Sequence, residues 1–397
     1  MKHFLLLVTI LFIAACEPAA PKQFALDMPG SKDAMAPRIS SLPGGEILLS
    51  WIEPGEVSSL RFAVYDGLEW SEPRVAAEGS DWFNNWADTA GVTALGNGLL
   101  VAHWLQKNGE STYAYEVRYA VSSDGGKSWS EPRRAHDDPS ASEHGFVSII
   151  PRGNGFEMFW LDGRKTAGNA HAHGETAESD GEIAGMTLRM GRFAADGERL
   201  LEQEIDGLTC DCCPTAAARQ GDDSLVVYRD RDEQERRDIY LARISEDGEV
   251  QRREVHDDAW HMPACPVNGP AVATVDSATH ILWFTGVDGK REIRYAVAPD
   301  GKSFAEPVKV AGGDAQGRVS LVQAGDELVA MWLAGQGSEG RIQLASLVDG
   351  KVGEPVTVDG MSVARRVGYP QLGVIGGGDL LVAWTSAEGL VGKRLQR

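Results

Sequence analysis

The sequence has few cysteines and few basic residues for its length. Its 397 residues include five cysteines, and 58 acidic side chains outnumber 38 lysines and arginines, which gives a net charge of −20. Proteins that bind nucleic acids take much of their affinity from cationic contacts with phosphates. The composition therefore argues against a nucleic-acid partner, and an anionic ligand would need a local arginine cluster to overcome the general field.

A long apolar run occurs only at the N-terminus, which reads MKHFLLLVTILFIAAC. Its apolar stretch of about ten residues has the layout of a signal peptide and is too short to span a membrane. We expect a lipoprotein signal peptide over residues 1–15, lipidation of Cys16, a tether over residues 16–22 and a single domain over residues 23–397. Because Glu17 follows Cys16 in place of the aspartate that signals inner-membrane retention, we favour the outer membrane. The alternative is an ordinary secretion signal.

The sequence also lacks a sustained 3.6-residue period, which argues against helical domains. Instead, an apolar strand with an aromatic residue near its end recurs at intervals of 49 to 68 residues, at Trp51, Trp104, Trp160, Tyr228, Trp283, Trp332 and Trp384. Alternating strands such as YEVRYAVSS follow it. Four short strands per repeat predict an all-β propeller, and we favour seven blades over six.

The last repeat is one strand short. It supplies three strands over PQLGVIGGGDLLVAWTSAEGLVGKRLQ, whereas the earlier repeats supply four. The segment QFALDM, residues 23–28, can provide the missing outer strand by pairing with residues 389–395. This pairing would close the ring.

A second motif lies in the turns. SSDGGKSW, residues 122–129, has the pattern S-x-D-x-G-x-x-W, and shorter relatives occur as YDGLEW (65–70) and APDGKSF (298–304). In such a hairpin the aspartate accepts backbone N–H bonds and the glycine takes a positive φ. The motif resembles the Asp-box of the sialidase superfamily (BNR repeats), and the chain as a whole resembles the sialidase-like lipoproteins of bacteria. In that superfamily the boxes are structural.

The resemblance implies an exo-acting glycoside hydrolase that removes terminal sialic acids without a cofactor. Sialidases hold the substrate carboxylate with three arginines, use an aspartate as acid/base and attack with a tyrosine that a glutamate activates. By motif or by position in the repeat, the resemblance assigns these roles to Arg38, Arg318 and Arg366, to Asp88, to Tyr369 and to Glu143. Sialic acid or a related acidic glycan would be the ligand.

Unusual polar residues occur at two positions of the repeat, just before the first strand and at the end of the second. In a propeller both positions open on the same face, so we expect a ligand-binding channel mouth there. Besides the residues above, it would comprise Trp82, Asn85, His103, His144, Asp162, Arg164, Asp230, Arg231 and Asn268. The alternative is that these residues cap a wet channel and tie the blades together.

Four cysteines occupy the same positions in two neighbouring repeats. Cys210, Cys212 and Cys213 precede the first strand of the fourth repeat, and Cys265 precedes that of the fifth. We therefore expect one cluster, which would form two disulfides or bind zinc or cuprous copper. The alternative to a glycosidase is a non-catalytic propeller that binds glycans, a metal or a partner through this charged, Cys-containing channel mouth.

Overall fold

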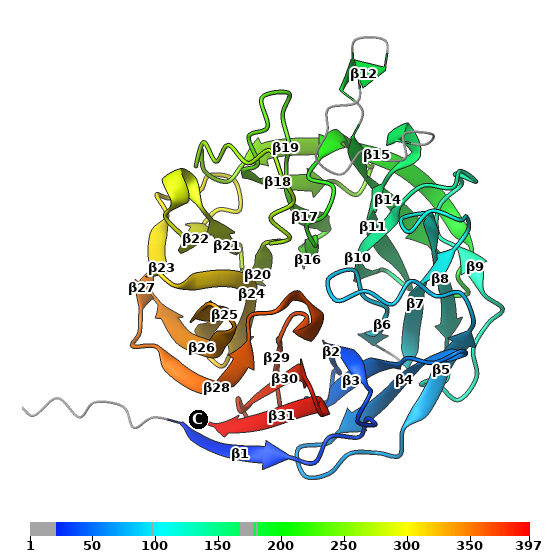
Figure 1. Ribbon diagram of the computed structural model, residues 1–397, viewed down its shortest axis with the longest axis horizontal. Helices are drawn as coiled ribbons and strands as arrows, with labels where there is room; N and C mark the ends of the chain where they lie inside the picture. The colour runs from blue at the N-terminus through cyan, green and yellow to red at the C-terminus, as the bar shows by residue number, and fades with distance from the viewer. Residues whose placement is uncertain (1–20, 97, 167–177, 180–181, 184) are drawn as a thin grey trace, which may run out of the picture.

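The chain folds as a ring of seven antiparallel β-sheets around a central axis (Figure 1). The structure is a computed structural model that describes residues 21–96, 98–166, 178–179, 182–183 and 185–397. The predicted signal peptide, Cys16 and most of the tether lie outside these residues. In the described part, the helices are the short 3-10 turns η1 (Arg164–Thr166), η2 (Val287–Gly289) and η3 (Arg365–Val367). None of them has the length or apolar character to cross a membrane.

The first four blades follow the chain from its N-terminal side. Blade 1 comprises β2 (Met35–Ser41), β3 (Ile47–Glu53), β4 (Ser58–Tyr65) and β5 (Arg74–Gly79). Blade 2 comprises β6 (Gly91–Gly96), β7 (Leu99–Lys107), β8 (Tyr115–Ser122) and β9 (Arg133–Arg134). Blade 3 comprises β10 (His144–Arg152), β11 (Gly155–Asp162), β14 (Met186–Phe193) and β15 (Arg199–Thr209), with the hairpin β12 (Glu178–Ser179) and β13 (Glu182–Ile183) inserted. Blade 4 comprises β16 (Ala216–Gln220), β17 (Asp223–Arg229), β18 (Ile239–Ile244) and β19 (Val250–Glu254).

The remaining blades complete the ring. Blade 5 comprises β20 (Ala271–Val275), β21 (Ala278–Thr285), β22 (Glu292–Ala298) and β23 (Val308–Gly312). Blade 6 comprises β24 (Ala315–Ala324), β25 (Glu327–Gln336) and β26 (Glu339–Val348), with β27 (Lys351–Val352) and β28 (Val356–Ser362) both paired to β26. Blade 7 comprises β29 (Gln371–Val374), β30 (Leu380–Ser386), β31 (Gly389–Gln396) and the N-terminal β1 (Lys22–Leu26).

The N-terminal strand closes the ring, as the sequence predicts. β1 pairs antiparallel with β31, from Lys22 opposite Gln396 to Leu26 opposite Gly392. Figure 1 shows the two strands side by side, blue against red. The prediction of an all-β propeller with seven blades is thus confirmed.

The hydrophobic core is divided among the junctions between blades. Seven clusters of buried apolar residues occur in the described chain, and each combines side chains of two neighbouring blades. The recurring aromatic residues belong to these clusters, and Trp51, Trp160 and Trp283 are at most 1% exposed. The repeat in the sequence therefore reflects one requirement, which is to fill the space between adjacent twisted sheets.

The Asp-box motif has the structural role that the resemblance implies. The Asp124 carboxylate accepts the backbone N–H groups of Lys127 and Ser128 at 2.9 and 3.0 Å. Trp129 packs edge-on against Phe62 of blade 1, with ring centroids 6.1 Å apart. The motif thus stabilises the turn and links two blades at the periphery.

Candidate functional site

A cavity of about 450 Å³ lies on the axis of the propeller, lined by the inner strands of all seven blades. Small polar and apolar side chains make up most of its wall. Of the described residues that line it, two carry ionisable side chains of opposite sign, Arg38 on β2 and Asp88 in the loop before β6. One cation and one acid in a mostly neutral channel can orient a small polar ligand.

Arg38 extends toward neighbouring blades along the channel wall. Its guanidinium donates to the carbonyl oxygens of Thr89 and Val147, both at 3.3 Å, which are long hydrogen bonds. A Cβ at Gly91 would lie 2.5 Å from Arg38 Cδ, so only glycine leaves room for this side chain. Burial lowers the pKa of Arg38, and the neighbouring Asp88 opposes this effect. The weak hydrogen bonds leave the guanidinium able to exchange partners for a bound anion.

Asp88 is part of a buried acid pair joined by a tyrosine. The Tyr115 hydroxyl lies 2.9 Å from Asp88 Oδ2 and 2.7 Å from Glu143 Oε1, and Asp88 Oδ1 accepts the Phe146 N–H at 2.7 Å. A hydroxyl has one proton and can donate to one of the two carboxyl groups at a time. The other contact is a hydrogen bond only if that carboxyl carries a proton.

The surroundings of Asp88 favour its protonated form. Burial raises the pKa of Asp88 to about 7, and the nearby Glu143 adds to this rise. The Phe146 N–H and the Arg38 guanidinium act in the opposite direction. A carboxylic acid that holds its proton near neutral pH can act as a general acid.

The rim of the cavity carries two aromatic residues. Trp86 and Tyr369 stack with centroids 6.2 Å apart and an interplanar angle of 16°. The Asn85 side-chain oxygen accepts the backbone N–H groups of Ala87 and Asp88, which holds this loop in place. The Tyr369 hydroxyl donates to the Val267 carbonyl at 2.6 Å, and burial raises its pKa.

The structure does not bring the three arginines implied by the resemblance into one carboxylate clamp. The Arg318 guanidinium donates to the carbonyls of Gly368 at 2.7 Å, Val363 at 3.1 Å and Ala364 at 3.2 Å, and it packs over Trp86. Arg366 is exposed on η3. Arg318 therefore holds the loop that carries Tyr369, and Arg38 is the arginine that lines the cavity.

Several residues expected at the mouth lie outside the described lining of the cavity. The residues concerned are Trp82, His103, His144, Asp162, Arg164, Asp230, Arg231 and Asn268. Trp82 stacks on Trp104 in the core between blades 1 and 2. His103 is fully buried, which lowers its pKa to about 3, and its Nε2 lies 3.1 Å from the Thr89 carbonyl.

Blade 3 contains a buried network of three of these residues. His144 stacks on His136 at 3.7 Å, and its Nε2 lies 3.1 Å from Asp138 and 3.6 Å from Asp162. Arg164 donates to both oxygens of Asp162. Although burial alone would raise it, the pKa of Asp162 is held at about 2, chiefly by Arg164. This network ties the strand ends of blade 3.

In blade 4, burial and the neighbouring Asp206 raise the pKa of Asp230 to about 8. Arg231 pairs with Asp211 at 3.1 Å and with Glu235 at 2.6 Å. Both residues belong to the hydrogen-bonding network at the end of β17.

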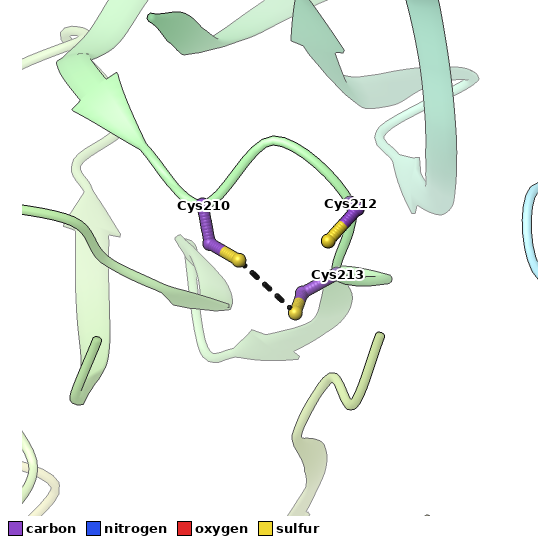
Figure 2. A group of neighbouring side chains, drawn as sticks. All are labelled: Cys210, Cys212 and Cys213. Carbon is purple, nitrogen blue, oxygen red and sulfur yellow. Dashed lines mark hydrogen bonds between the residues drawn. The ribbon is translucent and has the colours of Figure 1, made fainter. Parts of the chain in front are cut away.

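The cysteines do lie together: Cys210, Cys212 and Cys213 pack in the core between blades 3 and 4, and Cys265 from the loop before blade 5 packs against them. The sulfurs of Cys210 and Cys213 are 3.2 Å apart, and Figure 2 shows the three side chains of the loop pointing toward one another. Cys212 interacts with both and also with Cys265. Arg237 Nη1 lies 3.2 Å from Cys210 Sγ, and the Asn268 N–H lies 3.4 Å from Cys213 Sγ.

Two site residues, Tyr115 and Trp86, have no signal in the sequence that distinguishes them. Tyr115 begins the third strand of blade 2 within an ordinary alternating pattern. Trp86 follows Asn85 and lies two residues before Asp88. The polar composition of this loop is the one sequence feature that could have pointed to Trp86.

No family model and no curated protein matches the sequence. Solved structures share the fold. They include the polysaccharide lyase Uly1, with a TM-score of 0.54 at 10% identity over 93% of this chain and 90% of that one. The Hadza microbial sialidase Hz136 has a TM-score of 0.45 at 14% identity, covering 76% of this chain and 63% of its own length. The intramolecular trans-sialidase from Ruminococcus gnavus has a TM-score of 0.43 at 12% identity over 93% and 95% of the two chains. The chain folds as a seven-bladed β-propeller, and the polysaccharide lyase Uly1 shares this fold.

Proposed function

We propose that the central cavity binds the acidic terminus of a glycan and that Asp88 donates a proton to the glycosidic oxygen, as in an exo-acting glycoside hydrolase. The observation that carries the proposal is the pairing, in one otherwise neutral cavity, of Arg38 with a buried acid whose pKa is about 7. A guanidinium binds a carboxylate through two parallel hydrogen bonds. The substrate would thus carry a carboxylate, as sialic acid and uronic acids do.

In this mechanism Arg38 orients the sugar and the stacked pair of Trp86 and Tyr369 contacts its apolar face. Asp88 gives its proton to the leaving oxygen while a water molecule attacks the anomeric carbon, and the proton that this water releases returns to Asp88. Tyr115 holds Asp88 in place through the hydroxyl that it shares with Glu143. The clamp is smaller than that of sialidases, because Arg38 is the one arginine among the described residues that line the cavity.

The second candidate is a non-catalytic propeller that binds the same acidic glycans. The equivalent position in blade 5 favours this second candidate. Asn268 accepts a main-chain N–H of the next blade there, as Asp88 does in blade 2, although an amide cannot act as an acid. A structural role can therefore account for the placement of Asp88.

Fluorogenic glycosides of sialic acid and of uronic acids, assayed beside calorimetric titrations of the free sugars, test the proposal. We expect hydrolysis by the native chain, loss of turnover with retained binding in Asp88→Asn, and loss of binding in Arg38→Gln. Binding without turnover in the native chain would favour the second candidate. Absence of both would overturn the two candidates together.

The predicted lipid anchor at Cys16 would place this site in the cell envelope. Metabolic labelling with an alkyne fatty acid, compared between the native chain and Cys16→Ser, tests that placement. Label on the native chain alone is expected, and label on neither would leave the secretion signal as the explanation.

A further inference from the structure

The loop between β15 and β16 brings three thiols into contact. The sulfurs of Cys210, Cys212 and Cys213 lie within 4.8 Å of one another, and the three side chains are at most 8% exposed. Cys265, from the loop before β20, interacts with Cys212 and is partly exposed. We propose that these four cysteines bind one thiophilic d10 metal ion, zinc or cuprous copper, between the loops that enter blades 4 and 5. This site is independent of the proposed glycosidase.

The spacing of the sulfurs suits a single metal centre. Zinc binds thiolates at about 2.3 Å in a tetrahedron, which places the sulfurs about 3.8 Å apart. The sulfurs of Cys210 and Cys213 are 3.2 Å apart, and all three in the loop fall within 4.8 Å. Changes of up to about 1 Å in the separations of the three loop sulfurs would bring them to this spacing. Thiolates select soft d10 ions over calcium or magnesium.

The surroundings suit thiolates. Arg237 Nη1 lies 3.2 Å from Cys210 Sγ, and the backbone N–H of Asn268 donates to Cys213 Sγ at 3.4 Å. Such donors orient and stabilise metal-bound sulfur, as outer-shell partners do in known sites. Arg237 is 1% exposed, so its charge lies in a medium of low dielectric. Arg237 pairs with Glu235 at 2.7 Å, and Glu235 is shared with Arg231. A metal centre with several thiolates carries net negative charge and would add to the compensation of these two cations.

Arg229 adds a second buried cation at the same place. Its guanidinium donates to the main-chain carbonyls of Asn268, Arg237 and Phe284 at 2.6 to 3.0 Å. Its own carbonyl accepts the N–H of Cys210 at 3.1 Å, which places it beside the loop. One guanidinium in contact with a sulfur and a second buried cation nearby favour an anionic centre over a purely apolar contact.

The metal would also support the wall of the central cavity. Pro214 and Thr215 follow Cys213 directly and line the cavity. Asn268, three residues after Cys265, accepts the Arg318 N–H in blade 6 at 2.9 Å. A metal that joins the two loops would therefore fix one side of the channel, and its loss would lower the stability of this junction.

Cobalt titration of the reduced, full-length chain under anaerobic conditions is the decisive experiment. Cobalt in a tetrahedral thiolate site gives intense visible d–d bands, a readout that needs no enzyme activity. We expect one equivalent of cobalt per chain with these bands, and displacement by one equivalent of zinc or of cuprous copper in competition with a chelator. Failure of the reduced chain to take up one equivalent would overturn the proposal.

Two variants sharpen the result. Cys265→Ser removes the partly exposed ligand without opening the core, and we expect at least the roughly 10- to 100-fold loss of affinity that outer-shell changes cause. Cys16→Ser, outside the cluster, should bind as the native chain does. Equal affinity in Cys265→Ser and the native chain would remove Cys265 from the site and overturn the four-ligand proposal.

Intact-mass measurement of the chain as isolated distinguishes the alternative chemistry. A gain of about four mass units on reduction would mean two disulfides within the cluster and would overturn the proposal. An unchanged mass, with about one equivalent of zinc or copper by elemental analysis, is the expected result.

Discussion

Asp88 and Asn268 hold equivalent places three blades apart. Each precedes the inner strand of its blade, and each side-chain oxygen accepts the main-chain N–H of a residue with positive φ in the next blade. Asp88 Oδ1 accepts from Phe146 (φ 55°) at 2.7 Å, and Asn268 Oδ1 accepts from Arg318 (φ 53°) at 2.9 Å. A residue other than glycine is strained at positive φ. Each of these hydrogen bonds therefore stabilises a backbone conformation that is otherwise unfavourable.

The equivalence predicts different outcomes for two substitutions of Asp88. Asp88→Asn should keep the hydrogen bond to Phe146, because Asn268 makes the same bond with an amide. Asp88→Ala leaves that buried N–H without its acceptor, which costs about 1–3 kcal/mol. Urea unfolding should therefore show the alanine variant to be less stable than the asparagine variant. Equal stability of the two would contradict the role of this bond.

The raised pKa of Asp88 predicts a dependence of stability on pH. The pKa is about 7 in the folded chain and 3.8 for the unperturbed group, so the folded state holds a proton that the unfolded state releases between these values. The free energy of unfolding should fall by up to about 1.4 kcal/mol per pH unit from pH 4 to 7, and this contribution should be constant above pH 7.

Asp88→Asn serves as the control, because it removes this titration and leaves the others. The difference in unfolding free energy between the native chain and the variant, measured at several pH values, isolates the contribution of Asp88. A difference that is independent of pH would show that Asp88 has an ordinary pKa. Hydrolysis, if Asp88 is the general acid, should decline above about pH 7.

Gly145 predicts a steric effect on the same carboxyl group. A Cβ at this position would lie 1.7 Å from Asp88 Oδ2, so Gly145→Ala must displace Asp88. We expect a loss of stability of about 1–3 kcal/mol, typical of overpacking, and a lower turnover. Gly360→Ala is the matched control, because its nearest neighbour would lie 3.9 Å away. Similar melting temperatures of the two variants would refute the close contact.

Arg318 and Arg366 should differ sharply when replaced. The three hydrogen bonds from Arg318 to carbonyls of the loop 363–368 need a guanidinium, which lysine cannot imitate. Arg318→Lys should lose about 1–3 kcal/mol of stability, whereas Arg366→Ala on the exposed surface should change it by less than about 0.5 kcal/mol. An increase in KM for an acidic sugar in Arg366→Ala would restore this residue to the binding site.

Deleting β1 should destabilise the whole ring. Without residues 21–26, β31 becomes an edge strand with unpaired backbone groups, and blade 7 has three strands. We expect a lower melting temperature and concentration-dependent aggregation, measured by calorimetry and light scattering. Adding a synthetic peptide of residues 21–28 should restore part of the stability, and no effect of the peptide would argue against the pairing.

The fold could be predicted because it repeats. A similar apolar strand recurs seven times, and each recurrence indicates the same packing between adjacent sheets. The last repeat has one strand too few, which identified the N-terminal segment as the strand that closes the ring. The site was harder to predict, because a residue's position in the repeat indicates which end of a strand it occupies but not where its side chain points. His144 and Asp162 lie at the expected strand ends, yet they are fully buried within blade 3.

Long side chains limited the prediction further. Tyr115 starts β8, two strands away from the channel, and its hydroxyl still reaches Asp88. Arg318 lies in the inner strand β24, but its guanidinium turns to the loop that precedes the next blade. The cysteines were easier to place, because their side chains are short and the register of two neighbouring strands determines their separation.

The pairing of β1 with β31 also sets an order of events during synthesis. Among the described strands β1 is made before all others and its partner β31 after all others. Blades 1 to 6 can therefore assemble as an open arc before β1 and β31 pair. Until they pair, the arc has unpaired strand edges, so aggregation is most favoured before the ring closes.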